Sequence, residues 1–384
     1  MNERSLVAVV ATKDHGGTQG AIAAGLEATG LGEVLRPGAK ILIKPNFHGG
    51  EGYTSPEFVE ALVREVRERV AGEVVVGDGP FYGMEDSSEY YECIGVAEVC
   101  RRVGVELVSF HQGEYDLIEP GLRALPKTIG VTKWLAWADV VIDAPVMKTH
   151  FNVATTLAIK NLKGCIRPRD KRDLHTMDLH LAIAALAKII RPHITIMDAT
   201  TAYEGMGPSA ATPVDLGLVI VGTTPFEVDV VANWLMGLEP AQVRYLREAE
   251  TLGLGQVPGG IDAIAARTNL GAEELLGLRR NFARPYDEAH GRFPNLRINA
   301  EMACSGCLMN LFTALGEMKG AGEADDLRGY IVIGRVPEGD WPDLAVGGCT
   351  FSAWDETESV PGCPPTIEQI KTALRVMSKR EARS

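Results

Sequence analysis

The chain has 384 residues, of which 51 are Asp or Glu and 38 are Lys or Arg, so its formal net charge is −13. This length allows one to three domains with a well-buried core. The excess of carboxylates disfavours a general nucleic-acid partner, which would need a basic face, and no apolar stretch is long enough to span a membrane.

Short apolar strands alternate with helices over the first 240 residues. Residues 56–70 place Phe58, Leu62 and Val66 at helical spacing, with charged residues on the opposite face. This alternation predicts an α/β fold with a mainly parallel sheet and helices on both faces. We expect strands at residues 5–11, 40–44, 73–76, 105–109, 140–144, 194–197 and 218–221, and helices near 21–28, 56–70 and 179–190.

The pattern changes after residue 240. Residues 241–293 contain polar helical stretches separated by breaks, and the last segment carries four cysteines and an apolar strand at 330–334. We therefore predict three parts: an α/β domain (1–240), a helical connector (241–293) and a small cysteine-rich module (294–384).

The four C-terminal cysteines are Cys304 and Cys307 in CSGC, Cys349 in GGCTF and Cys363 in VPGCPP. A C-x-x-C pair, a distant cysteine and a final Cys-Pro suit the four thiolate ligands of a 4Fe-4S cluster, and the flanking glycines allow close backbone approach. These segments resemble the proximal-cluster segments of nickel–iron hydrogenase small subunits and of the related complex I subunit.

Two other interpretations of the cysteines remain open. Structural zinc also accepts four thiolates, although it usually uses two closely spaced pairs. Disulfides are the second alternative, but the N-terminal segment lacks the features of a secretory signal, so we expect a cytoplasmic protein in a reducing compartment.

Polar residues follow several of the predicted strands, and the carboxyl ends of parallel strands form the usual binding edge of such sheets. Lysines that gather there would bind the phosphate or carboxylate of a substrate, and histidines would transfer protons near neutral pH. The residues concerned are Lys44, Lys148, His150, Lys160, Asn161, Lys163 and His175.

The sequence also resembles a family called domain of unknown function 362, over roughly residues 5–240. The resemblance rests on IKPN, VIDAPVMKTH, TTLAIKNLKG, ITIMDATTAYEGMGP and TTPFEVDVVA in this order. It implies an α/β domain and a redox role, because members often carry a ferredoxin-type iron–sulfur module. The matching positions are Lys44, Asn46, Lys148, His150, Lys160, Asn161, Lys163, His175, Asp198 and Asp229.

From these features we predict an iron–sulfur oxidoreductase, or its electron-transfer subunit, acting on an anionic substrate or cofactor. We expect His150, His175 and Lys148 to be catalytic and the other matching residues to bind the substrate. A redox partner protein is also expected. A non-redox enzyme with a structural cluster, acting on a phosphorylated or carboxylated metabolite, and a carrier of a cluster or cofactor remain as alternatives.

Overall fold

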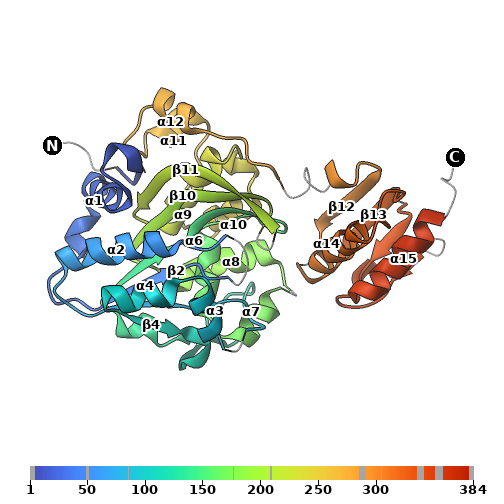
Figure 1. Ribbon diagram of the computed structural model, residues 1–384, viewed down its shortest axis with the longest axis horizontal. Helices are drawn as coiled ribbons and strands as arrows, with labels where there is room; N and C mark the ends of the chain where they lie inside the picture. Colours follow the sequence, from blue (N-terminus) through green and yellow to red (C-terminus); the bar gives the residue numbers. More distant parts are fainter. Residues whose placement is uncertain are drawn as a thin grey trace. The chain divides into compact units, whose positions relative to one another are not determined.

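The computed structural model describes residues 5–48, 52–84, 86–175, 177–207, 210–284, 291–303, 305–334, 341–350 and 358–379 (Figure 1). The chain forms two compact units. Unit 1 comprises residues 1–174 and 179–283, and unit 2 comprises residues 175–178 and 284–384.

A mixed nine-stranded sheet forms the centre of unit 1. Its main order is β1-β11-β10-β7-β2-β3-β4, and β8 pairs with β10 on one side and with β9 on the other. A separate hairpin pairs β5 (Tyr115–Ile118) with β6 (Ile129–Thr132). The sheet strands are β1 (Val7–Ala11), β2 (Ile41–Pro45), β3 (Val74–Asp78), β4 (Glu106–Ser109), β7 (Val140–Ala144), β8 (Val146–His150), β9 (Ala154–Thr156), β10 (Ile194–Met206) and β11 (Ala210–Gly222).

The predicted α/β fold with a mainly parallel sheet is confirmed for unit 1. Strands β10, β7, β2, β3 and β4 are parallel neighbours, whereas β11 is antiparallel to both β1 and β10. β10 and β11 extend far beyond the apolar segments expected at 194–197 and 218–221. Their polar halves pair with each other, so backbone hydrogen bonds rather than burial extend these strands.

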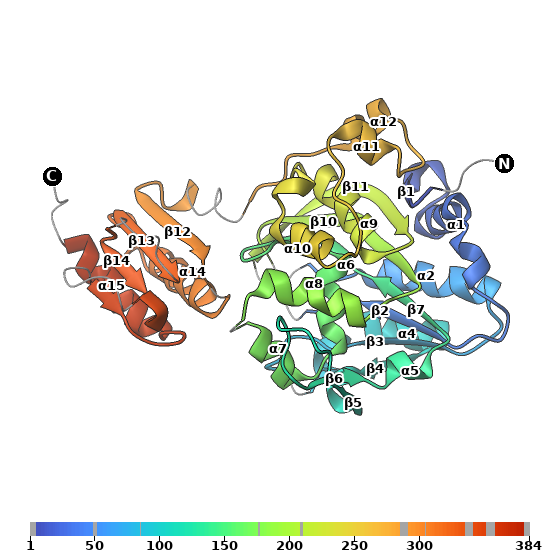
Figure 2. The same ribbon diagram turned by 180° about the vertical axis from the view of Figure 1, so that it is seen from behind.

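Helices cover both faces of this sheet (Figure 2). Alternate residues of β1 point to opposite faces: Ala8 and Val10 pack with α1, α2 and α4, whereas Val7 and Val9 pack with α9. The helices of unit 1 are α1 (Thr18–Thr29), α2 (Pro56–Arg69), α3 (Ser88–Cys93), α4 (Val96–Val103), α5 (Trp134–Trp137), α6 (Ala158–Asn161), α7 (Pro168–Leu174), α8 (Leu179–Ile189), α9 (Pro225–Leu235), α10 (Arg244–Thr251), α11 (Ile261–Ala265) and α12 (Ala272–Leu278).

The segment expected to be a connector belongs largely to unit 1. Residues 241–283 are part of that unit, and Tyr245 and Leu246 of α10 are fully buried. The sequence shows many charged residues here, but its few apolar side chains are enough to attach α10 to the domain. The boundary between the units therefore follows residue 283 instead of residue 240.

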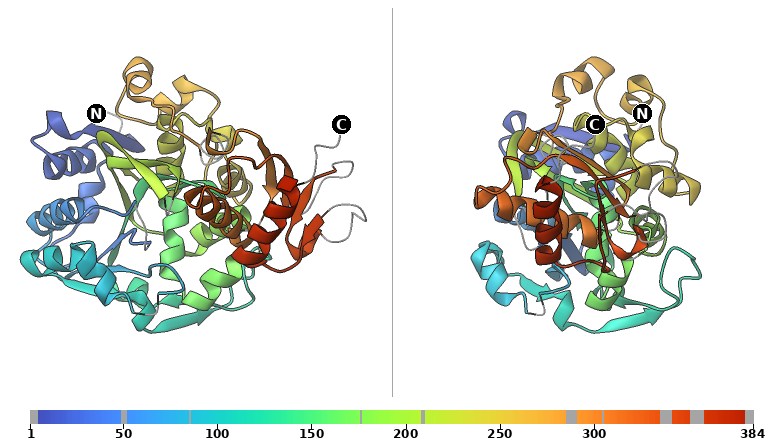
Figure 3. Two further views of the ribbon diagram at one scale, coloured as in Figure 1. Left: turned by 45° about the vertical axis from the view of Figure 1, so that its right-hand side comes forward. Right: turned by 90° about the vertical axis from the view of Figure 1, so that its right-hand side faces the viewer.

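Unit 2 contains a parallel sheet in the order β12-β13-β14-β15, with two helices that pack side by side (Figure 3). Thr366 and Gln369 form a capping box before α15: the Gln369 amide donates to Thr366 Oγ1, and the Thr366 amide donates to Gln369 Oε1. The elements are β12 (Leu296–Met302), α14 (Ser305–Gly320), β13 (Gly329–Gly334), β14 (Leu344–Val346), β15 (Glu358–Val360) and α15 (Ile367–Lys379).

Across the described ranges of both units, none of the helices combines the length and apolar character needed to cross a membrane.

Candidate functional site

Lys44 and Asp78 form a buried ion pair where β2 and β3 end. Lys44 Nζ lies 2.6 Å from Asp78 Oδ1, and it also donates to the Pro45 carbonyl at 2.8 Å and to Asn161 Oδ1 at 2.9 Å. All three N–H groups of the ammonium are therefore used. Gly164 must lack a side chain, because a Cβ there would lie 2.5 Å from Lys44 Nζ.

Two asparagines extend this pair into a larger network. Asn46 Nδ2 donates to Asn161 Oδ1 at 2.9 Å, and Asn46 Oδ1 accepts from Lys148 Nζ at 2.7 Å. Lys148 also donates to the Gly52 carbonyl. The structure thus brings together Lys44, Asn46, Lys148 and Asn161, all of which the sequence analysis selected.

Burial affects the charge of three lysines, Lys148, Lys160 and Lys163. Lys148 is completely buried, and Lys160 and Lys163 are 5% and 9% exposed. Burial lowers the pKa of Lys160 to about 7. Burial also lowers the pKa values of Lys148 and Lys163, and the charge of Lys160 adds to both shifts. The charge of Lys160 therefore opposes protonation of both Lys148 and Lys163.

Asp143, at the end of β7, is a buried carboxyl that the sequence analysis did not select. Its Oδ1 accepts from Asn161 Nδ2 at 2.7 Å, whereas its Oδ2 has no hydrogen-bond partner among the described residues. Burial raises the pKa of Asp143 to about 7, against the opposing effects of the Lys44 charge and the Asn161 amide. Asp143 is therefore a proton-binding group beside the lysines.

Asp198 and Asp229 hold backbone in place. Asp198 Oδ2 accepts from the Ser55 amide and hydroxyl, which fixes the start of α2, and its Oδ1 accepts from Thr200. Asp229 on α9 accepts from the amides of Ala158 and Ile159 at 2.7 and 3.1 Å. The predicted role of both carboxylates in substrate binding remains a prediction, and their observed bonds are structural.

His150 lies at the end of β8, 3% exposed and stacked on Phe151. Its Nδ1 accepts from the amides of Asn152 and Val153 at 3.0 and 3.4 Å. An accepting Nδ1 leaves the proton of the neutral ring on Nε2, so His150 is arranged to donate a proton or hydrogen bond from Nε2. His175 belongs to the segment of residues 175–178 in unit 2, and its predicted catalytic role stays a prediction.

A buried pair of Lys171 and His111 was also missed by the sequence analysis. Lys171 Nζ donates to the carbonyls of Gly79 and Pro80 at 2.7 and 3.2 Å, and it lies 2.7 Å from His111 Nε2. His111 Nδ1 lies 2.8 Å from the Met84 carbonyl, to which it donates while Nε2 accepts. Burial and the Lys171 charge lower the pKa of His111 to about 4. These bonds hold the loop that follows β3.

In unit 2, two cysteine sulfurs approach one glycine. A Cβ added to Gly347 would lie 3.1 Å from Cys307 Sγ and 3.6 Å from Cys349 Sγ. The Gly348 amide donates to the carbonyl of Gly362, the residue before Cys363, at 2.6 Å, and Gly306 packs against Pro364. The three turns that carry these cysteines therefore meet at the carboxyl ends of β14 and β15.

Cys304, the first predicted ligand, lies outside the described residues. Within the described ranges, no group of three or more His, Cys, Asp or Glu side chains is arranged to hold a metal ion. No disulfide joins the six cysteines that the structure describes to one another. Binding of a cluster therefore remains a prediction for this unit.

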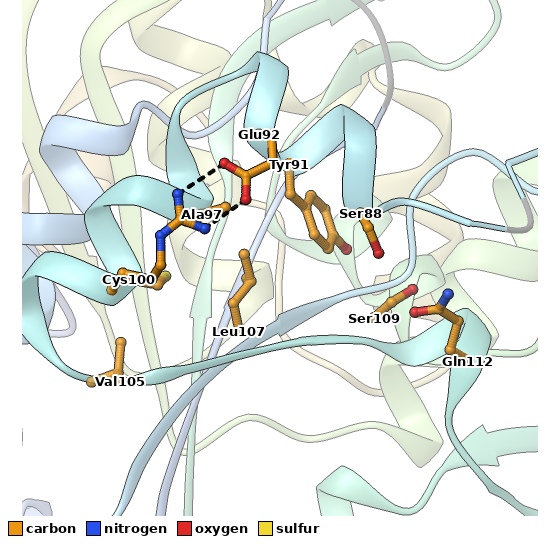
Figure 4. Close-up of a pocket in the computed structure, with 10 residues that line it drawn as sticks. Ser88, Tyr91, Glu92, Ala97, Cys100, Val105, Leu107, Ser109 and Gln112 are labelled. Atoms are coloured by element: carbon orange, nitrogen blue, oxygen red, sulfur yellow. Dashed lines mark hydrogen bonds and ion pairs between the residues drawn. The ribbon is translucent and has the colours of Figure 1, made fainter.

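A surface pocket of about 300 Å³ lies between α3, α4 and β4 (Figure 4). Its lining includes Tyr91, Cys100 and the ion pair of Glu92 with Arg101. Tyr91 donates to the Asp78 carbonyl, but none of the predicted site residues lines this pocket. The lysine network is thus a separate candidate site.

Comparison with known proteins identifies the family of this chain. Residues 41–233 match the family described as a domain of unknown function (DUF362). The chain belongs to this family. In this DUF362 chain the matched region includes every site residue that the sequence analysis selected in the α/β domain, and the C-terminal cysteines lie outside it.

One relative of this DUF362 chain is a thylakoid-associated protein of Synechocystis sp., 30% identical over 236 residues, which are 59% of this chain and 71% of that protein. Among solved structures, the lactate racemase apoprotein from Thermoanaerobacterium thermosaccharolyticum is similar with a TM-score of 0.41 and 11% identity. That similarity covers 79% of this chain and 62% of the racemase chain, so this chain spans about three fifths of the racemase.

The residues that were not selected for the candidate site differ in how visible they were. Asp78 is the last residue of β3, and Asp143 is the last but one of β7, as Lys44 is of β2, so strand position was a usable signal. His111 and Lys171 are 60 positions apart and lie in no recognisable motif. Only the folded chain brings these two side chains together.

Proposed function

We propose that this protein is an iron–sulfur oxidoreductase, or the electron-transfer subunit of one, that acts on an anionic substrate. The observation that carries the proposal is the approach of Cys307 and Cys349 Sγ to the same glycine, Gly347. The absence of a side chain at that position leaves space beside both sulfurs, as a bulky inorganic cluster requires.

The chemistry of the residues fits a 4Fe-4S cluster. Cys304, Cys307, Cys349 and Cys363 would hold it through their thiolates, and a cluster of this type supplies single electrons. Cys307 lies in the first turn of α14, where the positive end of the helix dipole favours a thiolate. Amide groups at the glycine turns would donate to cluster sulfides.

The buried lysines of unit 1 support the anionic substrate. Lys148, Lys160 and Lys163 would bind its phosphate or carboxylate. An anion would favour the charged forms of Lys148 and Lys163, which burial and the charge of Lys160 disfavour. Lys44 and Asp78 would hold Asn46 and Asn161 in position. His150 would donate from Nε2 to an oxygen of the substrate, and Asp143 would exchange a proton near neutral pH.

A second candidate is a non-redox enzyme for a phosphorylated or carboxylated metabolite, with a purely structural cluster. It is favoured by the composition of the lysine network, whose residues all belong to unit 1. Turnover of an anionic substrate that persists unchanged when a substitution shifts the cluster potential would select this candidate over the redox enzyme.

The cluster is tested by measuring iron, acid-labile sulfide and the EPR spectrum of reduced protein after anaerobic purification. We expect about four irons per chain. Cys363→Ser should lower the iron content or alter the EPR signal, whereas Cys93→Ser, at an exposed cysteine of unit 1, should change neither. Zinc in place of iron, or metal-free protein, would contradict the proposal.

The anion site is tested separately by calorimetric titration with inorganic phosphate and sulfate. Lys148→Met should weaken binding, because it removes one of the three buried lysines that we propose bind the anion. Lys171→Met is the matched control, since Lys171 is also buried but donates to the carbonyls of Gly79 and Pro80 and to His111 Nε2. Equal effects of the two substitutions would argue against a lysine site for anions.

A further inference from the structure

A surface pocket of about 590 Å³ lies at the amino ends of the central strands, and none of the predicted site residues lines it. Its lining combines the end of α1, the turn of residues 36–39 before β2, the start of β7 and His193, which precedes β10. A cavity of this size is in the range of small-molecule sites. The lysine network lies at the carboxyl ends of the same strands, so this pocket is a separate site.

Hydrogen bonds fix the segments that carry the polar lining. A bond between the backbone of its first and last residues closes the turn of residues 36–39. Asp139 Oδ2 accepts from the Lys40 amide at 2.9 Å, and the Asp139 amide donates to the Lys40 carbonyl at 2.9 Å. His193 Nδ1 accepts from the Val141 amide at 3.0 Å, and the His193 amide donates to the Val141 carbonyl at 2.9 Å. Three adjacent strands, β2, β7 and β10, therefore hold this lining at one edge of the sheet.

Two side chains of the pocket offer hydrogen-bond donors. Arg36 is exposed, and its guanidinium has no hydrogen bond or ion pair within the described part of the chain. An accepting Nδ1 leaves the proton of the neutral His193 ring on Nε2, which is the second donor. A guanidinium binds a carboxylate through two parallel N–H bonds, and an imidazole N–H adds a third. One part of the lining is therefore suited to a carboxylate.

The other polar part of the lining is suited to a cation. Asp139 Oδ2 accepts from the Lys40 amide, whereas Asp139 Oδ1 has no partner among the described residues. Thr29 and Gly30, at the carboxyl end of α1, also line the pocket, and the carbonyl groups at a helix end favour a positive charge. Glu33 adds a second carboxylate to the lining. A ligand with both an ammonium group and a carboxylate therefore complements this pocket better than a simple anion.

Apolar side chains make up the rest of the lining. Leu31, Val34 and Ala39 are partly buried and pack against the hydrophobic cluster on this face of the sheet, to which Val140 belongs. The surface that these side chains leave in contact with water would be covered by an apolar group of a ligand, which favours binding.

We propose that this pocket binds a free α-amino acid with an apolar side chain. Arg36 and His193 Nε2 bind its carboxylate, Asp139 Oδ1 and the end of α1 bind its ammonium group, and the apolar lining contacts its side chain. This inference is independent of the proposed function, because it uses neither the lysine network nor the cysteines.

The experiment is calorimetric titration of the full-length protein with L-valine, L-leucine and L-phenylalanine, and with two fragments of leucine. The fragment 4-methylpentanoate lacks the ammonium group, and 3-methylbutylamine lacks the carboxylate. We expect L-leucine to bind, and each fragment to bind about tenfold more weakly or less, because each lacks one set of charge-assisted hydrogen bonds. Binding of 4-methylpentanoate as tight as that of L-leucine would overturn the proposal.

Three variants locate the bound amino acid. Arg36→Met should weaken binding of L-leucine by about tenfold or more, since it removes the bidentate partner of the carboxylate. Asp139→Asn should also weaken it, and the remaining carbonyl oxygen can still accept from the Lys40 amide. Arg64→Met is the matched control: Arg64 is an exposed arginine of α2 that pairs with Glu60 outside the pocket, so binding should be unchanged.

The substituted side chains of Arg36 and Asp139 are exposed, so both variants should fold, and circular dichroism checks this. Binding of L-leucine that neither substitution weakens would show that the amino acid lies elsewhere and would overturn the proposal. Absence of binding by all three amino acids would overturn it as well. Either result would leave the lysine network and the cysteines untouched, since no residue of theirs lines this pocket.

Discussion

At the scale of single residues, Lys160 should make the stability of the protein depend on pH. Its pKa is lowered to about 7 in the folded chain, from 10.5 for an ordinary lysine. Between these values the unfolded chain binds more protons, so the free energy of unfolding rises with pH. The contribution of Lys160 is complete above about pH 10.5 and is lost progressively as the pH falls to about 7.

We therefore predict that Lys160→Met reduces the increase in unfolding free energy between pH 7 and pH 10. Each pKa unit corresponds to about 1.4 kcal/mol, so the effect is measurable by urea denaturation at several pH values. Lys127→Met, at an exposed lysine, is the control and should leave the profile unchanged. Parallel profiles for wild type and Lys160→Met would contradict the prediction.

At the scale of elements, Asp229 links α9 to the start of α6, the short helix that carries Lys160. Asp229 accepts hydrogen bonds from the first two backbone amides of α6, which have no acceptor within their own helix. Tyr245 of α10 also donates to Asp229 Oδ2, at 3.1 Å. One carboxylate therefore sets the position of a site helix against two neighbours. This arrangement accounts for a buried aspartate that need not touch a substrate.

Asp229→Ala should destabilise unit 1 by about 2–4 kcal/mol, because it leaves the buried amides of Ala158 and Ile159 without their acceptor. Asp229→Asn should cost less, since its carbonyl oxygen can still accept. Asp215→Ala, at an exposed aspartate of β11, provides the comparison. Chemical denaturation measures all three, and a loss for Asp229→Ala no larger than for Asp215→Ala would disprove the capping role.

At the scale of the whole molecule, unit 1 contains two large hydrophobic clusters. One extends from Ala8 to Val221 and the other from Val7 to Phe282 along the chain, on opposite faces of the sheet. Neither cluster includes a residue beyond 283, so unit 1 has a core of its own.

A chain that ends at Ala283 should therefore fold, unfold cooperatively and bind phosphate, while it should contain no iron. Circular dichroism during thermal unfolding, calorimetry with phosphate and iron analysis test these three expectations against the full-length protein. Aggregation of the shortened chain, or loss of cooperative unfolding, would show that unit 1 depends on the C-terminal residues.

The sequence by itself determined the central strands and helices. Residues 41–45, 74–78 and 140–144 are short apolar runs, and α2 and α8 show continuous apolar faces, so local patterns were enough to locate them. The same strand ends predicted that Lys44, Asn46, Lys148 and Asn161 would meet, because parallel strands end at one edge. Local sequence also specified the cap of α15 by Thr366 and Gln369.

Only the tertiary structure decided which of these polar residues organise the site and which are available for chemistry. Lys44 and Lys160 are both buried lysines, but Lys44 has Asp78, Asn161 and a carbonyl as acceptors, whereas among the described residues Lys160 donates to Thr156 alone. The acceptors of Lys44 come from separate segments of the chain, and so do the donors to Asp229. Hydrogen bonding and desolvation depend on neighbours that are distant in sequence, and these neighbours are fixed only when the chain folds.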